Sequence, residues 1–169
     1  MKKRFLNRDK YRVRIYNKSD VVIHLERKSK QNNQTFKSKC SLTKKEFEQM
    51  RLHQFDWMQE DERSLIRDLY KDIQLYALKP MTVVDYEREV YIYEHGNVRV
   101  TFDCKVQTSL RNTEMFNKKL PMVDVLEPNE VILEVKYDEY LPNVIKMILQ
   151  GIHTRHEAYS KYQLSRMYV

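Results

Sequence analysis

Glycine is scarce in this chain, which has only two glycines, Gly96 and Gly151, among its 169 residues. The phosphate-binding loops of nucleotide-binding folds are glycine-rich, because the backbone must approach the phosphate closely. Neither a P-loop nor a dinucleotide fingerprint can be built from two isolated glycines. Any phosphate that this chain binds must therefore be held by side chains.

Cysteine and long apolar runs are equally scarce. The two cysteines, Cys40 and Cys104, form no CxxC pair, which is typical of proteins from a reducing compartment. No apolar run approaches the roughly 20 residues of a membrane-spanning helix, and the basic start Met-Lys-Lys-Arg lacks the apolar stretch of a signal peptide. These absences predict a cytoplasmic protein without a membrane span.

Charge, by contrast, is abundant. Lysine and arginine number 31 against 24 aspartates and glutamates, which gives a formal net charge of +7. Such a balance favours a polyanionic partner, which could be nucleic acid, anionic lipid or a phosphate-rich molecule. The length suits a single domain over residues 1–169 with a core of its own.

Residues 10–16 alternate basic and apolar side chains with a period of two, the pattern of a strand with one buried and one polar face. The cationic row consists of Lys10, Arg12 and Arg14. Neighbouring members of that row stand about 6–7 Å apart. One such row could be a solvated outer face, but the arrangement recurs in residues 21–30, 98–103 and 130–137.

The remaining pattern predicts an α+β fold, with antiparallel strands and helices between and after them. A capping box at residues 43–46 opens a short helix, and residues 61–78 have the clearest helical period. Gly96 and Asn97 mark the turn of a hairpin. Two further helices are predicted at residues 141–150 and 157–167, and residues 111–129 read as a long loop.

Charged residues on one face of so many strands favour an antiparallel barrel, closed or nearly so, in which the polar faces line a cavity. Arginine and lysine in such a cavity would bind phosphate oxygens. A carboxylate there would be repelled by phosphate unless it held a hard divalent cation such as Mg²⁺ or Mn²⁺. The chemistry that this combination implies is phosphoryl transfer.

Several segments, in this order along the chain, resemble a known family: Lys-Tyr-Arg-Val-Arg-Ile-Tyr (10–16), Leu-Glu-Arg-Lys (25–28), Val-Asp-Tyr-Glu-Arg (84–88), Asn-Val-Arg-Val-Thr-Phe-Asp (97–103), Val-Ile-Leu-Glu-Val-Lys-Tyr (131–137) and Tyr-Ser-Lys-Tyr (159–162). The family is the VTC domain, the catalytic domain of the vacuolar transporter chaperone polyphosphate polymerase. It belongs to the triphosphate tunnel, or CYTH-like, superfamily.

The resemblance implies a β-barrel tunnel that binds triphosphate or polyphosphate together with Mn²⁺ or Mg²⁺. Eukaryotic members make polyphosphate from ATP. By position, the phosphate-binding and catalytic residues would be Arg12, Arg14, Lys28, Arg88, Arg99 and Lys161. Lys136 would join the phosphate ligands, and Glu134 would be the metal ligand.

The chain departs from the family pattern at its start. The family places a strand with Glu-x-Lys-Tyr, a helix and another strand before the segment that corresponds to residues 10–16, whereas only nine residues precede it here. A tunnel short of a strand would leave unpaired sheet edges. We therefore expect an incomplete tunnel, weakened turnover, and either a homodimer through an exposed edge or pairing of residues 1–9 as a substitute strand.

Three functions remain open at this point. The chain could be a polyphosphate polymerase, a triphosphatase that uses the same cations and metal, or a module that binds polyphosphate or another polyanion without turnover. Nucleic acid is not an expected partner, because aromatic residues do not interleave with the cations as a stacking platform requires. Asp103 could equally pair with a neighbouring arginine or hold a metal.

Overall fold

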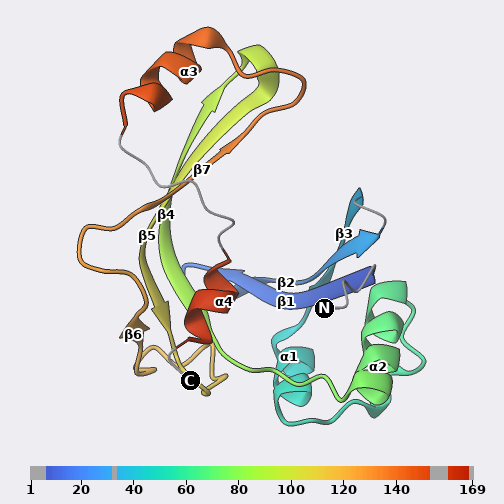
Figure 1. The fold of residues 1–169 in the computed structure, drawn as a ribbon. Helices are drawn as coiled ribbons and strands as arrows, with labels where there is room; N and C mark the ends of the chain where they lie inside the picture. Colours follow the sequence, from blue (N-terminus) through green and yellow to red (C-terminus); the bar gives the residue numbers. More distant parts are fainter. Residues whose placement is uncertain (1–6, 32–33, 153–159, 168–169) are drawn as a thin grey trace, which may run out of the picture. The chain divides into compact units, whose positions relative to one another are not determined.

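The computed structural model describes residues 7–31, 34–152 and 160–167, with the side chains of residues 7 and 8 left aside. Two compact units divide the chain. Unit 1 comprises residues 1–80 and 115–118, and unit 2 comprises residues 81–114 and 119–169. The predicted α+β class is confirmed, since antiparallel sheets and helices make up both units (Figure 1).

Unit 1 is a three-stranded antiparallel sheet with helices on one face (Figure 1). Its strands, in sheet order, are β1 (Asn7–Tyr16), β2 (Ser19–Gln31) and β3 (Gln34–Leu42). Its helices are α1 (Lys44–Arg51), the short 3₁₀ helix η1 (Asp56–Met58) and α2 (Ser64–Tyr76). The predicted capping box of α1 is confirmed, because Thr43 and Glu46 exchange hydrogen bonds between side chain and backbone.

The turn between β1 and β2 begins the pairing of the first two strands. Asn17 and Lys18 both have positive φ, of 53° and 54°, and the flanking residues Tyr16 and Ser19 are paired. Two consecutive left-handed residues are the requirement of a type I′ hairpin turn, whose twist matches that of the strands. Between Arg14 and Tyr16 the register shifts, so the turn alone does not set the rest of the ladder. From Ile23 onward, odd-numbered residues of β2 face the helices and even-numbered residues face away.

The core of unit 1 lies between the sheet and its helices. Its buried side chains come from the sheet and from all three helical segments, namely Ile23, Leu25, Leu42, Met50, Met58, Leu65, Ile66 and Leu69. Two polar contacts cross the same interface: the Tyr11 hydroxyl donates to Asp72 at 2.8 Å, and Arg27 pairs with Asp68 at 2.9 Å. Because both acids lie one helical turn apart on α2, they fix the rotation of that helix against the sheet.

Unit 2 is built on a long hairpin (Figure 1). Its elements are β4 (Val84–Tyr93), η2 (His95–Asn97), β5 (Val98–Thr108), β6 (Val123–Asp124), β7 (Ile132–Lys136), α3 (Asn143–Gln150) and α4 (Lys161–Ser165). Strand β5 pairs with β4 on one side and with both β6 and β7 on the other. The predicted turn is confirmed, and Gly96 has φ of +76° there.

The described strands form two separate sheets, each with its own pairings, and no closed barrel, so the expected incomplete tunnel stays a prediction. The region predicted as a loop, residues 111–129, contains the short strand β6. The last helix, α4, begins at Lys161, later than predicted, and residues 157–159 lie outside the described residues. Among the described helices, none combines the length and the apolar character that crossing a membrane requires.

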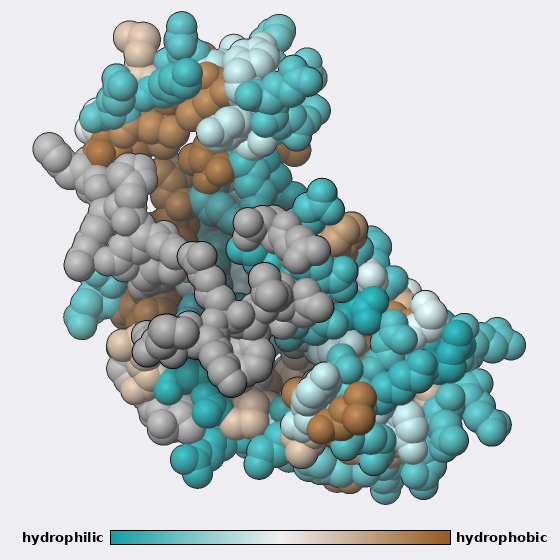
Figure 2. Space-filling model, turned by 45° about the vertical axis from the view of Figure 1, so that its right-hand side comes forward, coloured by the Kyte–Doolittle hydropathy of each residue, from teal (hydrophilic) through white to brown (hydrophobic). Residues whose placement is uncertain are grey.

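Hydrophobic side chains reach the surface of unit 2 around α3 and the end of the hairpin, as Figure 2 shows in brown at the top of the view. Met147 of α3 is 71% exposed and Ile92 of β4 is 77% exposed. Most of the other coloured surface in that view is hydrophilic.

Candidate polyanion-binding faces

The face of the first sheet that points away from the helices is rich in cations. Residues directly opposite one another in an antiparallel ladder share a face, with β-carbons about 4.5–5.5 Å apart. The pairings from β1 through β2 to β3 give three cross-strand rows: Lys10–Lys28–Lys37, Arg12–Glu26–Lys39 and Arg14–His24–Ser41. The predicted ligands Arg12, Arg14 and Lys28 therefore lie together on one face, and β3 adds Lys37 and Lys39 to them.

Glu26 is the carboxylate at the centre of these rows. It accepts from Nε of Arg12 at 2.5 Å and lies 3.8 Å from Nη1 of Arg14. Its charge offsets only part of the surrounding positive charge. The three rows therefore contain more cationic than anionic side chains.

The second sheet carries four of the other predicted ligands on one face, and the fifth, Lys161, belongs to α4. The pairings place Arg88 opposite Asp103, Glu134 opposite Thr101, and Lys136 opposite Arg99. Since Arg99, Thr101 and Asp103 alternate along β5, all of these side chains share a face. Glu134 pairs with Lys136 at 3.1 Å, and both are half-exposed.

Asp103 lies at the centre of the most tightly bonded group in unit 2. Its side chain has no exposed surface, and it accepts from Nε and Nη2 of Arg88 at 2.5 and 2.7 Å and from Nζ of Lys161 at 2.5 Å. Burial alone would raise the pKa of this carboxyl, but the hydrogen bonds from Arg88 and Lys161 outweigh it and hold the pKa below its usual range. Of the two roles open for Asp103, the structure shows the pairing with cations.

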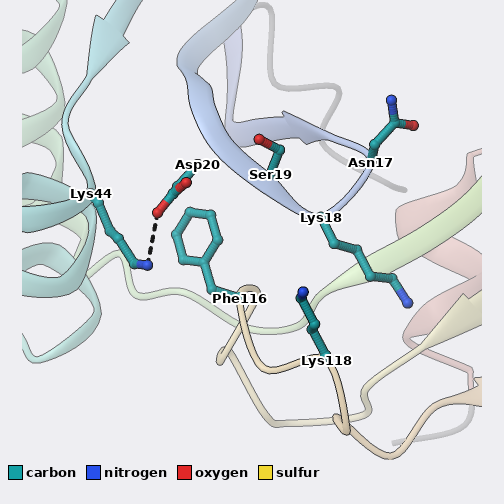
Figure 3. A pocket seen from close by; sticks show the side chains of 7 residues that line it. All are labelled: Asn17, Lys18, Ser19, Asp20, Lys44, Phe116 and Lys118. Carbon is teal, nitrogen blue, oxygen red and sulfur yellow. Dashed lines mark hydrogen bonds and ion pairs between the residues drawn. The ribbon is translucent and has the colours of Figure 1, made fainter.

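A hollow of about 340 Å³ lies in unit 1 beside the β1–β2 turn, lined by Asn17, Lys18, Ser19, Asp20, Lys44, Phe116 and Lys118 (Figure 3). The Lys44 ammonium pairs with Asp20 at 2.8 Å and stands 5.1 Å from the centre of the Phe116 ring. The ring also packs edge-on with Phe47, 5.3 Å between centroids. These contacts hold residues 115–118 against unit 1. The hollow lies where this segment packs on the β1–β2 turn, and we assign it no ligand.

Metal ligands are sparse in the part of the chain that the structure describes. Within it, no three His, Cys, Asp or Glu side chains gather closely enough to hold a metal ion. Glu134 is thus the single predicted metal ligand on its face, because Asp103 is already bonded to two cations. One carboxylate suits Mg²⁺ or Mn²⁺ only where phosphate oxygens and water complete the coordination.

The predicted site residues fall into two groups. Arg12, Arg14 and Lys28 belong to unit 1, while Arg88, Arg99, Glu134, Lys136 and Lys161 belong to unit 2. That both groups meet in one cavity stays a prediction. Sequence reasoning missed Lys37 and Lys39, although the alternation Lys37-Ser38-Lys39 in a strand that pairs with β2 could have shown them.

An antiparallel α+β chain with cations gathered on one face of each sheet has the features expected of a domain that binds polyanions. The model of the VTC domain family matches residues 2–169, and the chain belongs to that family. No curated protein and no solved structure matches the chain.

Proposed function

We propose that this chain binds linear polyphosphate on the cationic face of the β1–β2–β3 sheet, with the cations of unit 2 supplying further phosphate contacts. The observation that carries this proposal is the surplus of positive charge in the three cross-strand rows, where six lysines and arginines accompany one carboxylate, that of Glu26. A surface of this kind attracts a polyanion.

The chemistry of the face favours phosphate over nucleic acid. The three cross-strand rows contain no Phe, Tyr or Trp among their described side chains. Proteins that bind single-stranded nucleic acid combine a basic groove with aromatic rings on which bases stack. A chain of phosphates has no bases, and lysine and arginine alone suffice to bind it.

Metal-dependent phosphoryl transfer, as in polyphosphate synthesis from ATP or triphosphate hydrolysis, is the second candidate function. It is favoured by Glu134, which stands on the same face as Arg88, Arg99 and Lys136. Glu134 would hold a divalent cation, which when bound would neutralise charge on phosphate oxygens. The arginines and lysines would orient the phosphates, a task that carries much of the catalysis in such reactions.

Calorimetry with the whole chain tests the proposed binding. We expect linear polyphosphate to bind with an affinity that falls steeply with salt, because each ion contact exchanges with counterions. Single-stranded DNA of equal total charge should bind more weakly. If DNA binds as tightly as polyphosphate, the face binds polyanions without selectivity and the proposal fails.

Incubation with ATP and Mn²⁺ separates the enzymatic alternatives. A polymerase yields chains of increasing length, a triphosphatase yields free phosphate, and a binding module yields neither. Released phosphate and chain length are therefore measured in the same sample.

Glu134→Gln is expected to weaken the dependence on divalent metal while leaving metal-free polyphosphate binding largely unchanged. The substitution preserves size and removes the charge that would hold a hard cation, so the Mn²⁺ concentration for half-maximal effect should rise roughly tenfold. The measurement is a Mn²⁺ titration of polyphosphate binding. Asp124→Asn, an exposed carboxylate on β6 of the same unit, is the control. An unchanged titration in Glu134→Gln would make Glu134 only the ion-pair partner of Lys136.

A further inference from the structure

The buried carboxylate of Asp103 is stabilised by two cationic side chains. A carboxylate without exposed surface is costly unless it is paired and hydrogen-bonded. Asp103 is held on both oxygens, by the guanidinium of Arg88 and by the ammonium of Lys161. These three residues come from β4, β5 and the first residue of α4, so the carboxylate joins the last helix to the hairpin.

A tyrosine completes the cluster. The Tyr86 ring lies 5.2 Å from Cζ of Arg88 and 5.0 Å from Nζ of Lys161, measured to the ring centroid. Both distances allow a cation–π attraction. The two cations are therefore held by a carboxylate and by an aromatic ring at the same time, which restricts side chains that would otherwise have many rotamers.

Arg88 and Lys161 have further N–H donors besides those that contact Asp103. Asp103 uses Nε and Nη2 of Arg88, so that Nη1 stands outside the carboxylate contact. The ammonium of Lys161 has three donors, and one of them is directed at Asp103. Both side chains keep about a fifth of their surface exposed, 23% for Arg88 and 22% for Lys161. With two cations and one carboxylate, the cluster has a net positive charge.

We propose that Asp103 is a positioning residue of the phosphate site, which holds Arg88 and Lys161 over Tyr86 so that their remaining donors meet one phosphate group of the polyanion. This inference rests on the proposed polyphosphate binding. It assigns Asp103 no contact with the ligand, because the two cations stand between them.

The inference predicts a change in polyphosphate affinity opposite to the one that charge alone predicts when Asp103 is neutralised. Removing a negative charge near an anionic ligand should strengthen binding if only Coulomb attraction counts. If Asp103 positions the two cations, its removal should weaken binding, because Lys161 and Arg88 lose their fixed geometry. The two accounts are thus separated by the direction of the change.

Asp103→Asn tests this directly in the whole chain, with linear polyphosphate as the probe. We expect about tenfold weaker binding, the scale of one hydrogen bond to a charged group, and a shallower dependence on salt because fewer ion contacts form. Glu87→Gln is the matched control. It removes the same charge from an exposed neighbour of Arg88 that pairs with Lys105 and touches neither cation of the cluster. Equal or tighter binding by Asp103→Asn would overturn the inference.

A second variant guards against misfolding. Asp103→Glu keeps the charge and lengthens the side chain by one methylene, which displaces both cations. Positioning predicts weaker binding for this variant as well, whereas a role through charge alone predicts no change. Thermal unfolding followed by circular dichroism shows which variants are folded.

Lysine acylation measured without polyphosphate distinguishes the failure of the proposed binding from the failure of the positioning inference. In the free wild-type protein, Lys161 should be acylated several-fold more slowly than the exposed Lys71, as followed by mass spectrometry, and Asp103→Asn should remove this protection. If wild type binds no polyphosphate but the protection is seen, the proposed function fails and the placement of Lys161 by Asp103 stands. If Lys161 reacts as fast as Lys71 in wild type, the positioning inference fails.

Discussion

Arg14→Ala is expected to weaken polyphosphate binding by about ten- to 150-fold, which corresponds to about 1.5–3 kcal/mol for hydrogen bonds to a charged group. Arg14 lies on the cationic face of β1, opposite His24, and its side chain is 23% exposed. A guanidinium in this setting is partly fixed and incompletely solvated, so its contact with phosphate is stronger than that of a freely exposed lysine. Isothermal titration calorimetry at constant ionic strength measures the change.

Lys71→Ala is the control for Arg14→Ala. Lys71 is an exposed cation of α2, on the helical side of unit 1 and therefore away from the cationic face. The control removes one positive charge and should change the affinity only slightly. Equal losses in the two variants would show that net charge, and not the face of β1, controls binding.

Leu25→Ala is expected to destabilise unit 1 by about 2–5 kcal/mol, the range for removing a large aliphatic side chain from a packed core. Leu25 lies on the central strand β2 with only 1% of its surface exposed, and it belongs to the cluster between the sheet and α2. Trp57, the single tryptophan of the chain, packs against that cluster. Its fluorescence during urea unfolding therefore reports on this unit.

Val21→Ala serves as the control on the same strand. Val21 is 86% exposed, so its truncation should change the free energy of unfolding by no more than about 0.5 kcal/mol. A similar small change in Leu25→Ala would mean that the cluster around Leu25 contributes little to the stability of unit 1.

Local features of the fold could be predicted because their causes are local. The capping box at Thr43, the helical period that α2 follows and the turn at Gly96 each depend on residues within a few positions of one another. Strand partners could not be predicted in this way, because pairing joins distant segments. The sequence suggested one barrel, and the described strands pair within two sheets.

In the candidate site, too, features with local causes could be predicted and contacts between distant segments could not. The period-two pattern placed Arg12 and Arg14 on one face of their strand, because alternation determines this within a strand, whereas the position of Lys28 beside them depends on the pairing of β1 with β2. The role of Asp103 could not be decided between an arginine partner and a metal. Its second partner, Lys161, comes from a helix near the other end of the chain, and no local pattern connects the two.

The alignment of β1 and β2 has a consequence for how the cationic face can change in evolution. The turn at Asn17 and Lys18 and the register shift that follows it together set the alignment of the two strands, and beyond the shift side chains alternate between faces. An insertion or deletion of one residue in β2 would move its lysines into the core and bring Ile23 and Leu25 to the surface. Single substitutions can therefore change the cationic face one charge at a time, whereas a shift of one position would disrupt the core and the cationic face together.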